Sequence, residues 1–225
     1  IRLQRVWSPD ALLPFSIAES RHLRQEMSVD ELLYTGFYPR IYDQGLDPAQ
    51  ALGDYFETYI ERDVRQISEI RNLSSFQKFV RLCAGRSGQL LNYQSLGNDA
   101  GVSHTTARQW ISVLEASDVV FLLEPYFANV SKRLIKSPKL YFYDVGLAAS
   151  LVGIEDSRQV TTHPLKGPLF ETLVVVEALK HRFNQGRRSN LSFYRDSTGT
   201  EVDLLYSLAN HLIAVEVKAG ETVSR

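Results

Sequence analysis

The chain has 225 residues, of which 44% are hydrophobic and 23% charged, and a formal net charge of −1 at pH 7. These values are typical of one to three globular domains and exclude a strongly basic nucleic-acid-binding protein, so any such binding would depend on local patches. The single cysteine excludes a disulfide framework and a cysteine-based zinc site. No apolar stretch is long enough for a transmembrane helix, and no signal peptide is recognisable. We therefore expect a cytoplasmic protein without membrane contact.

Residues 1–73 are expected to form mainly helices. The clearest of these is residues 54–70, where large apolar side chains recur at steps of three and four residues: Tyr55, Phe56, Tyr59, Ile60, Val64 and Ile67. Such spacing predicts an amphipathic helix that needs a partner surface. The aromatic stripe is interpreted as core packing and not as a cofactor site.

Residues 74–147 have the organisation of a winged helix-turn-helix. Leu96 and Ala100 give a first short helix an apolar side, Gly101 suits the tight turn, and Ser103 is a favourable N-cap for the next helix. Along that second helix the inward positions recur at helical spacing: Ala107, Trp110 or Ile111, and Leu114. A strand, a basic loop and a second strand follow, as expected of a wing.

The outer side of the second helix and the wing are the candidate nucleic-acid interface. The outward residues of the helix are His104, Thr105, Arg108, Gln109 and Ser112. The basic loop, residues 131–139, carries Lys132, Arg133, Lys136 and Lys139. Helix residues of this kind read base edges, and lysines contact phosphates. The helix also contains Glu115 and few cations, so a role as a spacer or protein-contact module remains the alternative.

Residues 148–225 begin with a predicted helix over 167–183. Pro168 suits its first turn, and Glu171 shares a face with apolar residues, which predicts a partly buried carboxylate in need of a cation or hydrogen bonds. The alternative is a surface glutamate that pairs with Arg182 or a neighbouring loop. Glu177 is a reserve candidate with the same ambiguity.

Two predicted strands near the end of the chain carry the most informative acidic residues. In GTEVDLLY, Asp203 shares a face with Glu201 and Leu205, and in LIAVEVKAG, Glu216 and Lys218 share a face. If these strands are neighbours, carboxylates and a lysine converge, which is the arrangement that holds a divalent cation and stabilises charge on a phosphate. The alternative is a set of surface charges on an edge strand.

This order of a helix with Glu171, a strand with Asp203 and the sequence Glu216-Val217-Lys218 resembles the PD-(D/E)xK restriction-endonuclease-like fold. The resemblance implies that Glu171, Asp203 and Glu216 bind Mg²⁺ or Mn²⁺ and that Asp203, Glu216 and Lys218 act in catalysis. Lys218 would help to activate water or stabilise the developing charge.

Several motifs taken in order resemble one family, the prokaryotic AAA-type predicted ATPases with a C-terminal domain of unknown function. The motifs are LLPFSIAE, GFYPRIY, YIERDV, the helix-turn-helix, KSPKLYFYDVGLAASLVG, GPLFETLVVVEAL, GTEVDLLY and IAVEVKAG. The resemblance implies that residues 1–73 are the tail of an ATPase core with a helical lid or connector, and that the full-length parent binds ATP and can self-associate. No G-x-x-x-x-G-K-[ST] motif occurs here, so we expect no ATP binding by these residues.

The predicted fold class is therefore α+β: a helical lid remnant (1–73), a winged helix (74–147) and an α/β nuclease-like domain (148–225). Two functional hypotheses follow. In one, the chain is part of an ATP-dependent protein that acts on nucleic acid and has a metal-dependent phosphodiesterase site. In the other, the nuclease-like domain is a non-catalytic binding module of a regulatory or scaffold ATPase.

Overall fold

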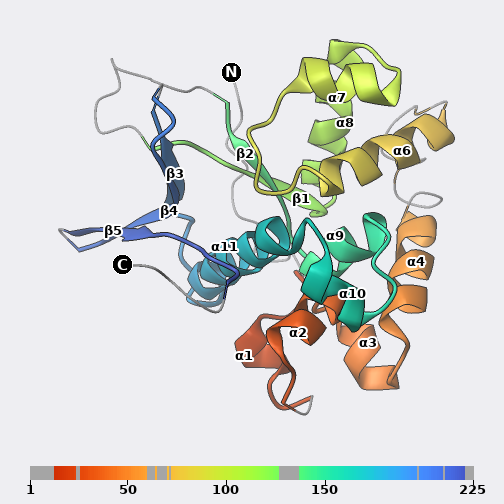
Figure 1. Ribbon diagram of the computed structural model, residues 1–225, viewed down its shortest axis with the longest axis horizontal. Helices are drawn as coiled ribbons and strands as arrows, with labels where there is room; N and C mark the ends of the chain where they lie inside the picture. Colours follow the sequence, from red (N-terminus) through yellow and green to blue (C-terminus); the bar gives the residue numbers. More distant parts are fainter. Residues whose placement is uncertain are drawn as a thin grey trace.

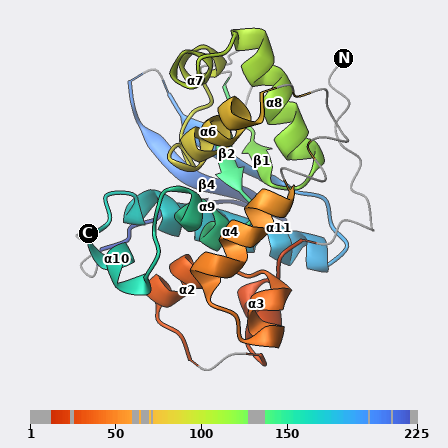
Figure 2. The same cartoon turned by 90° about the vertical axis from the view of Figure 1, so that its right-hand side faces the viewer.

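The computed structural model describes residues 13–23, 26–59, 64, 70, 72–126, 137–196, 198–209 and 211–220. It confirms a mixed α+β protein in which helices dominate and two small antiparallel sheets are present (Figure 1). In this view the N-terminal helices lie below, helices α6 to α8 lie above, and the three-stranded sheet stands to one side. Helices α9 and α11 lie between these groups (Figures 1 and 2).

The N-terminal part consists of four short helices, α1 (Ile17–Ser20), α2 (Val29–Thr35), α3 (Pro39–Gln44) and α4 (Pro48–Tyr59). Two of them begin with complete capping boxes, which satisfy backbone amides that a helix start leaves open: Ser16 with Glu19, and Ser28 with Glu31. Helix α4 begins six residues before the predicted start at 54, because Pro48 is well suited to a first turn. The predicted helix beyond Tyr59 falls mostly outside the described residues.

The middle part contains α6 (Leu73–Ala84), α7 (Tyr93–Ala100), α8 (His104–Ala116), β1 (Val120–Leu123) and β2 (Lys139–Phe142). Two local predictions are confirmed: Gly101 takes the left-handed conformation at φ 78°, and Ser103 caps α8 by accepting a hydrogen bond from the Thr106 amide. Strands β1 and β2 pair antiparallel. The predicted wing residues Lys132, Arg133 and Lys136 lie outside the described residues.

The assignment of Lys139 to a basic loop was wrong. Lys139 is the first residue of β2, pairs with Leu123 and forms an additional bridge with Leu90. Its side chain is 2% exposed. The neighbouring lysines are typical of a solvated loop, whereas the four residues that begin at Lys139 form a buried strand.

The C-terminal part contains α9 (Val145–Leu151), α10 (Ser157–Thr162), α11 (Lys166–Asn184), β3 (Leu191–Arg195), β4 (Glu201–Leu208) and β5 (His211–Val215). The sheet has the order β3-β4-β5, with both pairs antiparallel. The predicted adjacency of the last two strands is thus confirmed. Strand β5 ends at Val215, however, so Glu216 and Lys218 follow the strand instead of lying within it.

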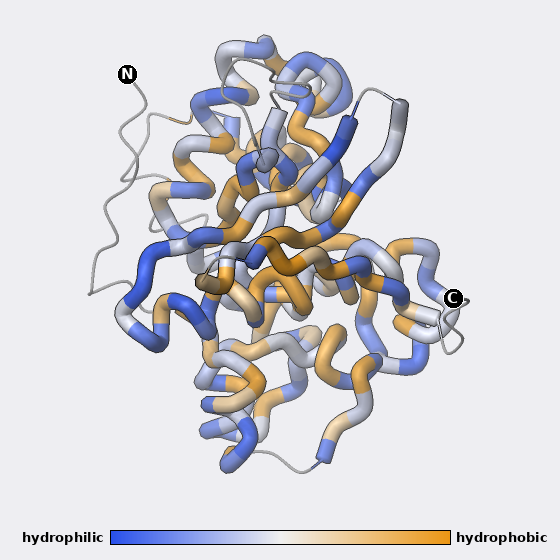
Figure 3. Tube along the Cα trace, turned by 90° about the vertical axis from the view of Figure 1, so that its left-hand side faces the viewer, coloured by the Kyte–Doolittle hydropathy of each residue, from blue (hydrophilic) through white to orange (hydrophobic). Residues whose placement is uncertain are grey.

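The parts share their cores. One apolar cluster joins the N-terminal helices to α6, α7, α8 and α9 and to the start of α11, while a second joins β1, β2, α11, β3 and β4. Apolar residues concentrate in the central segments of the chain trace (Figure 3). Within the described residues, no helix combines the length and the apolar character needed to cross a bilayer. Helix α11 contributes to both clusters, which fixes its side chains relative to β2 and β4.

Candidate functional site

The buried ammonium of Lys139 lies among three carboxylates. Its Nζ is 2.9 Å from Glu171 Oε1, 2.5 Å from Glu201 Oε1 and 3.8 Å from Asp203 Oδ1. The lysine comes from β2, Glu171 from α11, and the other two acids from β4. This carboxylate cluster, defined by Glu171, Glu201 and Asp203 around Lys139, ties the middle of the chain to its C-terminal sheet.

Tyr141 completes the cluster from the same strand face as Lys139. Residues two apart on a strand point the same way, and the Tyr141 hydroxyl donates a 2.5 Å hydrogen bond to Glu171 Oε1. The same oxygen accepts from Lys139. Phe193 of β3 lies beside the ammonium, with 5.5 Å from Nζ to the ring centroid. The Lys139 ammonium therefore contacts the carboxylates of the cluster and the aromatic ring of Phe193.

The protonation states of β2 follow from these contacts. Burial lowers the pKa of Lys139, but the hydrogen bond with Glu201 and the charge of Glu171 outweigh it, and the pKa is raised overall. Burial, with the Glu171 charge next, raises the pKa of Tyr141 far above its usual value. At neutral pH the lysine is thus a cation and the tyrosine a neutral donor.

The residues Glu216 and Lys218 form their own pair beside the cluster. Lys218 Nζ lies 2.5 Å from Glu216 Oε1, and both side chains are about half exposed, at 58% and 50%. The hydrogen bond with Glu216 raises the pKa of Lys218, and the charges of Asp203 and Glu171 add to this effect. Asp203 Oδ2 accepts a 2.8 Å hydrogen bond from the Val217 amide, which anchors this segment to β4.

The structure therefore brings together some of the predicted site residues. Glu171 and Asp203 converge on Lys139, while Glu216 is engaged by Lys218. Among the described residues, no group of three or more His, Cys, Asp or Glu side chains is arranged to hold a metal ion. An ammonium lies where the carboxylates converge, so Glu171 and Asp203 already have a cationic partner. The alternative pairing of Glu171 with Arg182 was wrong, since Arg182 donates to the Arg188 carbonyl.

The reserve candidate Glu177 has a different role, because it holds the segment before α1. Its Oε2 accepts a 2.8 Å hydrogen bond from the Ile17 amide, and the neighbouring Lys180 donates a 2.7 Å bond to the Phe15 carbonyl. Both residues lie on α11. These contacts tie the N-terminal segment to the C-terminal helix.

Helix α8 exposes the polar face that its sequence predicts. Ala107, Trp110, Ile111 and Leu114 are buried, which resolves the open choice between Trp110 and Ile111 in favour of both. The exposed residues of the face are His104, Thr105, Arg108, Gln109 and Ser112. The His104 ring packs edge-on against Tyr93 of α7, with 5.7 Å between centroids. The rest of the face is available to a partner.

Tyr141 and Glu201 were not identified as site residues from the sequence, and Lys139 was assigned to the nucleic-acid interface instead of to this cluster. Glu201 was placed on the same strand face as Asp203, which was a usable signal. For Lys139 and Tyr141 the signal was their spacing of two in KLYFYD, where every neighbour is apolar or aromatic until Asp144. A lysine at the start of a buried strand needs an acidic partner.

The chain is similar to three proteins of known sequence and matches two protein families. The chain is 31% identical over 178 residues to "Uncharacterized protein Rv2008c" of Mycobacterium tuberculosis and equally to "Uncharacterized protein Mb2031c" of Mycobacterium bovis, covering 79% of this chain and 40% of each relative. It is 26% identical over 206 residues to "Uncharacterized protein MJ1637" of Methanocaldococcus jannaschii, covering 89% of this chain and 42% of the relative. The chain thus spans about two fifths of the length of these relatives.

No solved structure matches the chain. Residues 166–225, from the start of α11 onward, match the family described as "Domain of unknown function (DUF4143)". Residues 26–158, more than half of the chain, match the family described as "Domain of unknown function (DUF8612)". The protein therefore belongs to the DUF8612 family, and its residues 166–225 are similar to DUF4143.

Proposed function

We propose that this chain is part of a longer AAA-type ATP-binding protein, in which it serves as a nucleic-acid-binding module with a non-catalytic nuclease-like domain. The length of the relatives supports a larger parent, since the chain spans only 40% to 42% of them. In this proposal ATP binds to the remainder of that parent, because these 225 residues contain no P-loop motif.

The buried ammonium of Lys139 is the observation that supports a non-catalytic nuclease-like domain. A metal-dependent phosphodiesterase needs carboxylate oxygens that are open to a divalent cation. Here Glu171 and Glu201 are within 3 Å of Nζ, and Glu171 also accepts from Tyr141. Because Lys139 is 2% exposed and its stem is enclosed, it can leave the acids only by disrupting the core.

The arrangement of α6 to β2 supports the nucleic-acid part. Three helices followed by two antiparallel strands form the order of a winged helix, in which the last helix enters the major groove. The corresponding helix is α8, and its exposed face offers Arg108 and Gln109 for base edges. In this proposal the wing lysines Lys132 and Lys136, with Arg133, contact phosphates.

We expect Arg108→Ala to weaken binding to a labelled duplex oligonucleotide about tenfold at low salt, about 1.4 kcal/mol, because one cation is lost from the contact face. The slope of log affinity against log salt should fall by about 1. Fluorescence anisotropy across a salt series measures both.

The matched control is Arg158→Ala on α10, which removes an equal charge. Arg158 is 89% exposed and pairs locally with Asp156, away from α8. Equal weakening by both variants would show general electrostatic attraction, and unchanged binding by Arg108→Ala would contradict the assignment of α8.

A second candidate function, metal-dependent phosphodiester cleavage, is favoured by one observation. Lys218 pairs with Glu216 at 2.5 Å, and Asp203 accepts a 2.8 Å hydrogen bond from the Val217 amide between them, so three residues that the PD-(D/E)xK resemblance implies lie close together. Calorimetric titration with Mn²⁺ separates the two functions. We expect no binding by the wild type or by Asp203→Asn. Binding by the wild type that Asp203→Asn and Glu216→Gln both abolish would instead establish a metal site and favour cleavage.

A further inference from the structure

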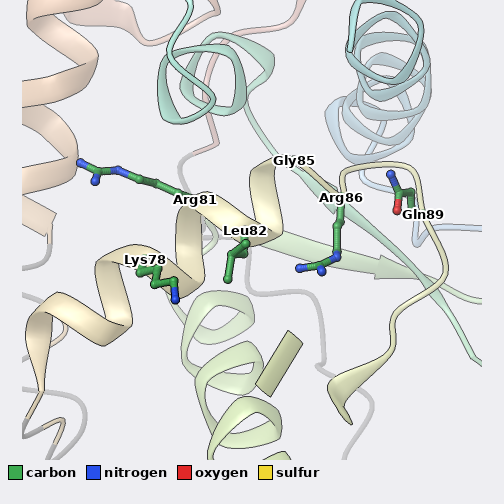
Figure 4. Close-up of a pocket in the computed structure, with 6 residues that line it drawn as sticks. All are labelled: Lys78, Arg81, Leu82, Gly85, Arg86 and Gln89. Atoms are coloured by element: carbon green, nitrogen blue, oxygen red, sulfur yellow. The ribbon is translucent and has the colours of Figure 1, made fainter. Parts of the chain in front are cut away.

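The surface beside α6 contains a hollow that the proposed nucleic-acid face of α8 does not include. It has a volume of about 470 Å³, is open to solvent, and is lined by Lys78, Arg81, Leu82, Gly85, Arg86 and Gln89 (Figure 4). Three of these six residues are cations and none is an acid. The lining comes from the second half of α6 and the turn that follows it.

The basic character of this segment is local, because the whole chain has a net charge of −1. Residues 72–98 hold Lys78, Arg81 and Arg86 and contain no Asp or Glu. Within the described residues, Lys78 and Arg81 have no ion-pair partner, and both are exposed. The segment therefore presents positive charge that the rest of the described structure does not neutralise.

Two of the cations face the same side of the segment. Lys78, Leu82 and Arg86 follow one another at steps of four residues, and Figure 4 shows all three projecting to the same side, while Arg81 extends in another direction. Leu82 separates the two charged groups and supplies an apolar floor. Lys78 and Arg86 can thus approach one ligand from two ends, with Arg81 adding longer-range attraction.

Arg86 is held in place and is incompletely satisfied. Its Nη2 pairs with Asp99 of α7, which fixes the guanidinium against the hollow. Its Nη1 is enclosed by protein and has no hydrogen-bond partner in the described part of the chain. The side chain as a whole is 27% exposed, so an oxyanion in the hollow can reach the guanidinium at its open edge.

We propose that this hollow is a phosphate-binding site, with Arg86 as its fixed donor and Lys78 as its mobile one. The ligand is a phosphate group of a nucleic-acid backbone, in which case the site extends the nucleic-acid contact proposed above and rests on that function. A small phosphate compound offers the same chemistry, and the test below distinguishes the two sources. Arginine suits this role because its planar fork matches phosphate oxygens.

The test titrates the 225-residue chain with a labelled duplex oligonucleotide and, separately, with inorganic phosphate while Arg side-chain NMR signals are followed. We expect Lys78→Gln combined with Arg86→Gln to weaken duplex binding at least about tenfold at low salt and to reduce the salt slope by about 2. The control is Arg187→Gln with Arg188→Gln, which removes two exposed cations from the loop after α11.

The outcomes separate this site from the function proposed for α8. Duplex binding that is unaffected by the Lys78 and Arg86 changes, or that falls equally in the control, would overturn the site while leaving nucleic-acid binding intact. No duplex binding by the wild type, with Arg86 signals that shift on addition of phosphate in the wild type and shift less in Lys78→Gln alone, would retain the site for a small phosphate compound and remove the nucleic-acid function. Binding of neither ligand would overturn both.

Discussion

Replacing Lys139 with methionine should lower the free energy of unfolding by about 3–5 kcal/mol. Methionine keeps the apolar stem of the side chain, so the loss comes from the charge. Without the ammonium, the carboxylates of Glu171, Glu201 and Asp203 remain close together and partly buried, at 18%, 28% and 13% exposure. Urea denaturation followed by circular dichroism measures the loss.

Two variants distinguish this explanation from a general loss of packing. Lys218→Met removes a lysine whose pair with Glu216 is half exposed, and it should leave the denaturation midpoint unchanged. Adding Glu171→Gln and Glu201→Gln to Lys139→Met should restore part of the lost stability, since it removes two of the three like charges that face one another. The loss of the 3.1 Å ion pair between Glu201 and Arg195 limits this recovery. A triple variant as unstable as Lys139→Met alone would show that the lysine acts through packing.

The pH dependence gives an independent check of the same cluster. The folded-state pKa of Lys139 is raised, so the stabilisation is fully present below the unfolded-state pKa, about 10.4, and is lost as the pH rises through the folded-state value. The stability difference between wild type and Lys139→Met should therefore be constant from neutral pH to about pH 10 and decrease above it. A difference that grows with pH in this range would contradict the ion-pair explanation.

The features that the sequence predicts correctly are local ones. The positions of α7 and α8, the left-handed Gly101 and the Ser103 cap depend on residues within one or two turns of each other. Their signals, helical spacing and capping chemistry, are therefore visible in a short stretch of sequence. The exposed face of α8 follows from the same spacing. Antiparallel pairing of β4 with β5 is also local, because the turn between them is short.

The carboxylate cluster could be predicted only in part, because its members come from three elements far apart in the sequence. Glu171 and Asp203 were identified from the faces that they occupy on a predicted helix and strand, but the residue between them in space, Lys139, is 32 positions before Glu171. Strand pairing and the packing of α11 on β2 bring Lys139 into contact with these carboxylates. Neither can be predicted from a short stretch of sequence. The end of β5 at Val215 was missed for a related reason: the alternation continues to Lys218, while the pairing with β4 stops at Leu204.

A second non-local contact shows how closely the N-terminal helices approach the rest of the chain. Gly36 ends α2 with a positive φ of 66°, and its backbone lies directly against Gly146 in the first turn of α9. Asp144 fixes this crossing from one side: its Oδ2 accepts from the Phe37 amide at 2.7 Å, and its Oδ1 accepts from the Leu147 amide at 2.8 Å. One buried carboxylate thus caps α9 and holds the chain that leaves α2.

Gly146→Ala should therefore destabilise the protein by at least about 3 kcal/mol. An added Cβ would lie 2.5 Å from both the nitrogen and the Cα of Gly36, and these are backbone atoms that cannot rotate away. The matched control is Gly53→Ala within α4, where an added Cβ meets nothing within 4 Å. That change should raise stability by about 0.5–1 kcal/mol, because alanine favours the helix. Thermal and urea denaturation of both variants tests the contrast, and a Gly146→Ala protein as stable as wild type would show that α2 and α9 do not meet at these two glycines.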